Sequence, residues 1–233
     1  MKLAIMQPYF LPYIGYWQLI NAVDKFVIYD NIQYTKSGWI RRNRILLNGK
    51  DFMISLPVKK DSDFLDIKDR YLSDNFLNEK NKIKNQITAA YRKAPYFKLV
   101  MPIIERILDN EEKNLFLYLY NSILLVKEYL NINTELIISS SINMNHTLKS
   151  QDRVLEICKQ LKADHYINPI GGTKLYDKEE FKKHGIKLSF LKTDDIIYKQ
   201  FDNEFIPNLS IIDVMMFNSR ETINEFLNKY SLI

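Results

Sequence analysis

The first thirty residues constrain the fold more than any other part of the chain. Residues 2–6 form a short apolar run typical of a buried strand. Pro8 and Pro12 follow, and each proline disfavours helical geometry in the residue before it, so a loop is expected there. The apolar spacing then predicts a helix over 13–23 and a second strand over 25–30. Such a compact βαβ unit pairs its strands in parallel, so we expect a parallel sheet.

Alternating strand and helix patterns return later in the chain, after a different central section. Asn48-Gly49 between two apolar runs predicts a β-hairpin over 44–56, and three predicted helices between 79 and 130 form a helical insertion over 75–131. The elements expected after it are strands at 134–138, 165–168 and 186–191 and helices at 151–161, 178–184, 211–217 and 220–230. The sequence therefore predicts a single α/β domain over 1–233, with a mainly parallel sheet built from βαβ units.

Composition excludes several classes of protein. With 46% hydrophobic residues in 233, the chain is not expected to be disordered, and no run reaches the roughly 18 apolar residues that a membrane-spanning helix needs. Gln7 and Pro8 interrupt the apolar start before a signal-peptide core is complete, which predicts a cytoplasmic location. Cys158 is the single cysteine and the three histidines are isolated, so no metal site is assigned, and the sequence identifies no cofactor.

The net charge of +5 is concentrated in one segment. Residues 36–60 contain seven basic residues and one acid, so this segment is predicted to face an anionic ligand. Arginine forks bind phosphate oxygens and an indole stacks on a base or a sugar ring, as in a nucleotide sugar or another phosphorylated small molecule. The predicted binding residues here are Lys36, Trp39, Arg41, Arg42 and Asn43. A solvated basic loop is the alternative, and no nucleic-acid-binding motif is present.

Polar and small residues follow the predicted strands, at the edge of a parallel sheet where ligands bind. The candidates after the first two strands are Gln7, Tyr9, Tyr13, Gly15, Asp30 and Gln33. The candidates after the later strands are His146, Gly171, Gly172 and Tyr176. Asp30, His146 and Gln7 are the predicted catalytic residues, because Asp30 or His146 could act as a general base. A capping or surface role for His146, and a plain turn at Gly171-Gly172, are the alternatives.

The loop after the first strand resembles, in layout, that of nucleotidyltransferase-like α/β folds. Residues 13–16, Tyr-Ile-Gly-Tyr, stand where nucleotidylyltransferases carry an H-x-G-H motif, and both histidines are absent. A helix N-terminus with Gly15 can still receive an anion. The alternative is that Gly15 only allows Tyr16 and Trp17 to pack.

Several motifs together resemble the WbqC-like protein family. They are the string 7–16, then Asp24, Asp30, Gln33 and Arg42-Asn43, followed by residues 166–169, Gly171-Gly172, Leu175-Tyr176 and 209–213. The resemblance spans nearly the whole chain. It implies a role in the biosynthesis of bacterial O-antigen and other surface polysaccharides.

Motifs and resemblance together predict a transferase that modifies a nucleotide-linked amino sugar by acyl or aminoacyl transfer. Gln7, Tyr9, Asp30 and Gln33 are expected to line the reacting centre. An ATP-dependent nucleotidyltransferase or ligase is one alternative. A non-catalytic protein that binds a glycan or a partner is another, and a homo-oligomer is compatible with the sequence.

Overall fold

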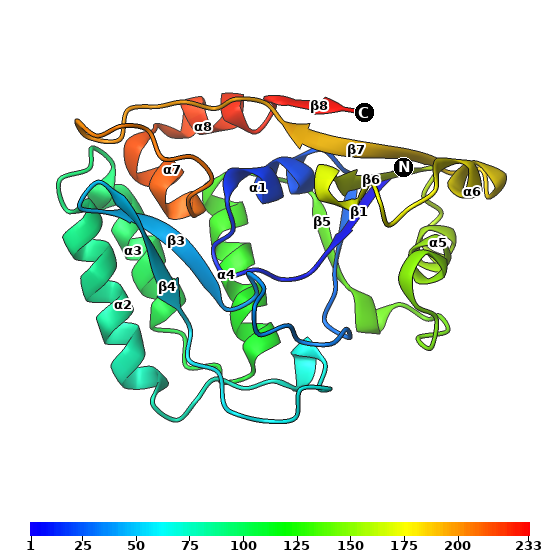
Figure 1. Ribbon diagram of the computed structural model, residues 1–233, viewed down its shortest axis with the longest axis horizontal. Coiled ribbons are helices and arrows are strands. Elements are labelled where there is room, and N and C mark those ends of the chain that lie inside the picture. Colours follow the sequence, from blue (N-terminus) through cyan, green and yellow to red (C-terminus); the bar gives the residue numbers. More distant parts are fainter.

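The computed structural model describes residues 1–233 and contains a central sheet of six strands (Figure 1). The strands in spatial order are β5 (Glu135–Ile138), β2 (Lys25–Ile28), β1 (Lys2–Met6), β6 (His165–Pro169), β7 (Lys187–Thr193) and β8 (Tyr230–Leu232). The first five are parallel and β8 is antiparallel to β7. The predicted α/β fold with a mainly parallel sheet is therefore confirmed.

The order of the strands reverses once, between β1 and β6. From β1 the chain moves outward to β2 and β5, and it then crosses to the other side of β1 to form β6 and β7. The loops that follow β1 and β6 therefore leave the sheet in opposite directions. Ligands of open α/β sheets bind in the crevice that such a switch point leaves at the carboxyl ends of the strands.

Alternate residues of the strands pack on the two faces of the sheet. Leu3 and Ile5 belong to a cluster of 14 buried residues that includes side chains of α5 (Ser150–Gln160) and α6 (Lys178–Lys183). Ala4 belongs to a cluster of 50 buried residues on the other face. Helices α1 (Ile14–Asn21), α4 (Leu115–Tyr129), α7 (Ile211–Phe217) and α8 (Arg220–Phe226) contribute to this larger cluster.

The connection from β2 to β5 contains the hairpin and the central helices. Strands β3 (Arg42–Leu47) and β4 (Lys50–Ser55) pair in a separate antiparallel sheet, and α2 (Phe76–Tyr91), α3 (Phe97–Leu108) and α4 follow. Asn48 and Gly49 both have positive φ, 53° and 72°, as a two-residue type I′ turn requires. This confirms the predicted hairpin, and Figure 1 shows it beside α2 and α3, at the opposite end of the molecule from α5 and α6.

Three short 3-10 helices, η1 (Ile67–Asp69), η2 (Ser139–Ser141) and η3 (Ile170–Gly172), lie in the connections. The predicted helix over 220–230 is too long, because α8 ends at Phe226 and β8 follows. Gln18 on α1 accounts for this end, since its Nε2 donates to the carbonyls of Phe226 (2.7 Å) and Lys229 (2.8 Å). None of the helices combines the length and the apolar character needed to cross a membrane.

A buried carboxylate fixes the long segment 194–210 that connects β7 to α7. Asp213 on α7 is fully buried and accepts hydrogen bonds from the hydroxyls of Tyr91 (2.8 Å) and Tyr198 (2.7 Å) and from Nε2 of Gln200 (2.6 Å). Burial raises the pKa of Asp213, and these three hydrogen bonds act in the opposite direction. We call Asp213 and its three partners the Asp213 cluster.

Candidate functional site

A cavity of about 330 Å³ lies at the switch point between β1 and β6, and we call it the switch-point cavity. Its lining residues are Ile5, Met6, Gln7, Tyr9, Tyr29, Ile32, Asn168, Pro169, Gly171, Gly172, Leu175 and Tyr176. No charged side chain is among them. The polar groups of the cavity are therefore neutral amides, phenols and backbone.

Asn168 is held in one orientation at the end of β6. Its Oδ1 accepts a hydrogen bond from the Tyr166 hydroxyl (3.0 Å), and its Nδ2 donates to the carbonyl of Pro169 (2.9 Å). A Cβ added at Gly172 would lie 1.8 Å from this Nδ2, so only glycine leaves room for the amide. The Tyr166 ring also packs edge-on against Tyr176, with centroids 5.7 Å apart. The buried Tyr166 thus positions two lining residues.

Tyr29 forms another part of the wall and is backed by a buried cation. The guanidinium carbon of Arg153 lies 5.1 Å from the centroid of the Tyr29 ring, and its Nη1 donates to the carbonyl of Asn31 (3.1 Å). Burial raises the pKa of the Tyr29 phenol, and the charge of Arg153 only partly opposes this. Burial also raises the pKa of Tyr9. Both phenols are therefore protonated at neutral pH and can donate hydrogen bonds.

Two of the predicted catalytic residues lie outside this lining. Asp30 is buried, and its Oδ1 accepts hydrogen bonds from Oγ of Ser139 (2.9 Å) and the backbone N–H of Ser140 (2.8 Å). It thereby joins the end of β2 to the end of β5. His146 has both ring nitrogens in contact with protein, Nδ1 with Nδ2 of Asn31 and Nε2 with the carbonyl of Ile142, each at 3.0 Å. Of the three predicted catalytic residues, Gln7 alone lines the cavity.

A second cavity of about 260 Å³ adjoins the first, and we call it the Trp39 cavity. It is lined by Tyr9, Pro12, Tyr13, Trp39, Asn43, Arg44 and Asn208. Because Tyr9 lines both cavities, they are neighbours along the carboxyl edge of the sheet.

Arg44 supplies the positive charge of the Trp39 cavity. Its guanidinium carbon lies 5.7 Å from the centroid of the Trp39 ring, and its Nη1 pairs with Asp51 (3.2 Å). Its Nε is buried and has no hydrogen-bond partner in the protein. The combination of arginine and indole that the sequence predicts is thus formed by Arg44, on β3, with Trp39.

The other cations of the basic segment contact the protein itself. Arg41 donates from Nη1 to the carbonyl of Leu56 (3.1 Å), and Arg42 donates from Nε to the carbonyl of Gly38 (3.1 Å). Lys36 forms an ion pair with Asp63, which lowers the pKa of that carboxyl. None of these three side chains lines either cavity.

Gly15 and Gln33 also make contacts within the chain. A Cβ added at Gly15 would lie 2.5 Å from ring atoms of Tyr13, so the glycine allows this ring to pack over the start of α1. The packing alternative therefore describes Gly15 well, with Tyr13 as the partner instead of Tyr16 or Trp17. Gln33 donates from Nε2 to the carbonyl of Asp63 (2.8 Å).

Comparison with known proteins places this chain in a family. The model of the WbqC-like protein family matches residues 7–225. The chain belongs to this family. It is also 28% identical, over 222 residues and 92% of the length of each protein, to an uncharacterized protein of Mycobacterium tuberculosis. No solved structure matches the chain.

The match to the WbqC-like family begins at Gln7, a lining residue of the switch-point cavity. Among the lining residues that sequence reasoning did not assign to the site of this WbqC-like protein are Tyr29, Asn168, Arg44 and Asn208. Tyr29 and Asn168 could have been found, because Tyr29 is the penultimate residue of the predicted strand 25–30 and Asn168 ends the predicted strand 165–168. Asn208 carries no such signal, since the long connection after β7 brings it to the site.

Proposed function

We propose that this WbqC-like protein is a transferase that acts on a nucleotide-linked sugar in the biosynthesis of bacterial surface polysaccharides. Membership of the WbqC-like family supports the part of the proposal that concerns polysaccharide biosynthesis. The observation that carries the ligand class is the position of Tyr9, which lines both an uncharged cavity and a cavity with an arginine and a tryptophan. A ligand that lies across Tyr9 needs an uncharged polar part and an anionic aromatic part, and a nucleotide sugar has both.

The sugar part would occupy the switch-point cavity. The amides of Gln7 and Asn168 can exchange hydrogen bonds with sugar hydroxyls, and the rings of Tyr29 and Tyr176 offer apolar faces to the sugar ring. The volume of about 330 Å³ falls within the range of small-molecule sites.

The nucleotide part would occupy the Trp39 cavity. Trp39 is partly exposed and can stack on a base, and the partly exposed guanidinium of Arg44 offers its charge to a phosphate oxygen. We therefore assign to Arg44 the role that the sequence predicted for Arg41 and Arg42. Those two arginines would stabilise the loop that carries Trp39.

Acyl or aminoacyl transfer would join the amine of the sugar to a carbonyl carbon. A C–N bond forms, and the bond from the carbonyl to the donor's leaving group breaks with its electron pair passing to that group. The proton lost by the amine passes through water at the mouth of the cavity to the leaving group, which departs with it. Gln7 and the backbone N–H groups of Gly171 and Gly172 would donate hydrogen bonds to the developing oxyanion. Orientation of the two reactants would supply the remaining acceleration.

A second candidate is a glycan-binding protein without catalytic activity. The observation that favours it is the lining of the switch-point cavity, which contains no carboxylate, imidazole or thiol. Both candidates share the same sugar site and differ only in turnover.

The test is a titration of the whole chain with UDP-, dTDP-, CDP- and GDP-linked sugars, followed by calorimetry. We expect at least one intact nucleotide sugar to bind more tightly than either its free nucleotide or its free sugar. Mass spectrometry after incubation of that ligand with acetyl-coenzyme A or an aminoacyl donor separates the candidates, since a transferase yields a heavier sugar. If no nucleotide sugar binds, the proposal is wrong.

A further inference from the structure

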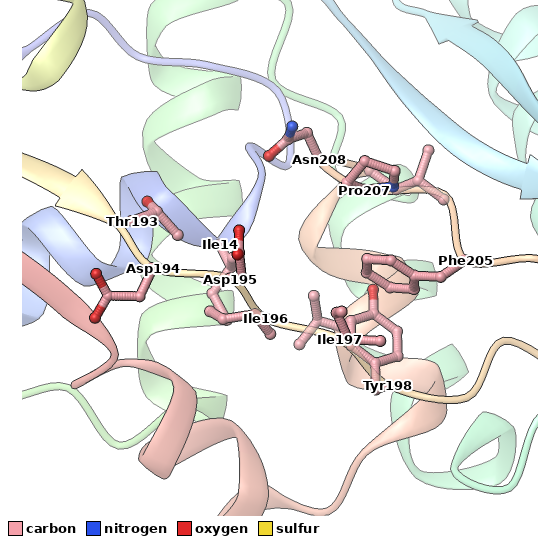
Figure 2. A pocket seen from close by; sticks show the side chains of 12 residues that line it. Ile14, Thr193, Asp194, Asp195, Ile196, Ile197, Tyr198, Phe205, Pro207 and Asn208 are labelled. Atoms are coloured by element: carbon pink, nitrogen blue, oxygen red, sulfur yellow. The ribbon is translucent and has the colours of Figure 1, made fainter.

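A third cavity, of about 520 Å³, lies at the carboxyl end of β7, and we call it the β7 cavity (Figure 2). The segment 194–210 forms most of its wall, and Thr193 on β7, Ile14 on α1 and Val214 on α7 complete it. Apolar side chains dominate the lining, among them Ile196, Phe205 and Leu209. The proposed function does not use this cavity.

Asp194 and Asp195 are the two charged residues that line the β7 cavity, and their surroundings differ. Asp194 accepts a hydrogen bond from Oγ of Ser231 on β8 (2.9 Å). Asp195 makes no hydrogen bond or ion pair within the chain, although the chain contains 33 lysines and arginines. Figure 2 shows the Asp195 carboxylate beside Ile14, whereas the Asp194 carboxylate points the other way. The exposed carboxylate of Asp195 thus lies at the rim of an apolar cavity and has no partner within the chain.

The walls of the β7 cavity are fixed by contacts outside it. Tyr198 donates to the buried Asp213 (2.7 Å), and Oγ of Ser210 donates to the carbonyl of Leu11 (2.7 Å). Both ends of the segment are therefore anchored to buried groups. A ligand would enter a preformed cavity and would not have to order its walls, which favours binding.

We propose that the β7 cavity binds a small ligand that carries a cationic amine and an apolar group. The ammonium group would pair with Asp195, and the apolar group would pack against Phe205 and Ile196. An anionic ligand is disfavoured, because two carboxylates and no cation line the cavity. Asn208 lines both this cavity and the Trp39 cavity, so the two cavities adjoin there.

The test uses phenethylamine as the probe, titrated into the whole chain by calorimetry. Phenethyl alcohol and hydrocinnamate are matched ligands that keep the phenyl group and replace the ammonium by a hydroxyl or a carboxylate. We expect saturable binding of one phenethylamine, about three- to fivefold weaker binding of the alcohol, and no binding of hydrocinnamate, because an exposed ion pair contributes up to about 1 kcal/mol. Raised salt should weaken only the binding of the amine.

Two variants locate the site. Asp195→Asn removes the charge at nearly constant shape and should reduce phenethylamine binding to the level of the alcohol, and Asp195→Glu should retain part of the affinity. Asp202→Asn is the matched control, since Asp202 lies in the same segment, outside the cavity, and pairs with Lys199. Equal binding of amine and alcohol, an unchanged affinity in Asp195→Asn, or no saturation by about 10 mM would overturn the proposal. The titration contains no nucleotide, so its outcome is independent of the proposed function.

Discussion

The Asp213 cluster and the carboxyl edge of the sheet use polar side chains in opposite ways. In the cluster, both oxygens of Asp213 accept hydrogen bonds from within the chain. At the edge, the guanidinium of Arg44 is partly exposed, and the carboxylate of Asp195 is exposed and has no hydrogen-bond partner in the protein. The cluster therefore stabilises the fold, and under the two proposals above the edge receives molecules from outside. Variants in the two regions should therefore separate loss of stability from loss of binding.

The largest effect is expected in the cluster. Asp213→Ala removes the carboxylate that accepts hydrogen bonds from the hydroxyls of Tyr91 and Tyr198 and from the amide of Gln200. Each buried polar group left without a partner reduces stability by about 1 to 3 kcal/mol. We expect the free energy of unfolding in urea to fall by about 3 kcal/mol or more. The control is Asp202→Ala, at an exposed position of the neighbouring segment, which should change stability by less than about 0.5 kcal/mol. Equal effects of the two variants would contradict a structural role for the cluster.

The second prediction concerns Gly172, which lines the switch-point cavity and lies against the Asn168 amide. In Gly172→Ala the new Cβ overlaps the Asn168 amide, and we expect overpacking to reduce stability by about 1 to 3 kcal/mol and to abolish sugar binding. Gly171→Ala is the matched control, because a Cβ there would meet no atom within 4 Å. Thermal unfolding and calorimetry measure the two effects. If both variants are equally stable, Asn168 is not held as we describe.

The third prediction tests the edge alone. Arg44→Ala should weaken nucleotide-sugar binding by about tenfold to a hundredfold, because a hydrogen bond to a charged group contributes about 1.5 to 3 kcal/mol. Stability should change little, since the ion pair of Arg44 with Asp51 is partly exposed.

The comparison for Arg44 is Arg42→Ala, which removes a guanidinium that donates to the carbonyl of Gly38. This variant should lower the melting temperature more than Arg44→Ala and leave the affinity of the folded protein closer to normal. The opposite ranking would return the phosphate contact to Arg42, as the sequence predicted.

The smallest effect is a dependence of stability on pH. Burial raises the folded-state pKa of Asp213 above its unfolded value, so the folded chain holds this proton more tightly. Protonated Asp213 therefore adds to the free energy of unfolding. This addition is complete below the pKa of Asp213 in the unfolded chain, about 4, and is lost as the pH rises through its pKa in the folded chain. Asp213→Asn cannot titrate, so urea unfolding between pH 4 and pH 7 should show wild type losing stability relative to this variant. A constant difference would mean that the three hydrogen bonds offset burial.

Local patterns predicted the fold well and the site in part. The Asn48-Gly49 turn and the helix over 211–217 depend on neighbouring residues, and both lie where the sequence predicts them. The strand β8 was missed, because its pairing with β7 depends on residues far apart in the chain.

Contacts between residues far apart in the chain also explain why the candidate site was predicted only in part. Gln7, Gly171 and Gly172 follow strands directly, so the parallel sheet brings them together as expected. Asp30 also ends a strand, yet its carboxylate is occupied by Ser139, a residue 109 positions away. A strand-end position predicts proximity to the edge of the sheet, and the partners that a polar side chain finds there decide whether it remains free.

The strand order also has a consequence for how the chain assembles. Strands β1, β2 and β5 come from the first 138 residues, whereas β6 and β7 come from the later part of the chain. The switch-point cavity lies on the seam between these two portions and exists only once β6 has joined β1. A molecule that fills the cavity therefore binds only the assembled form and shifts the folding equilibrium toward it by mass action. A ligand bound in the switch-point cavity is thus a sign that both portions of the sheet have assembled.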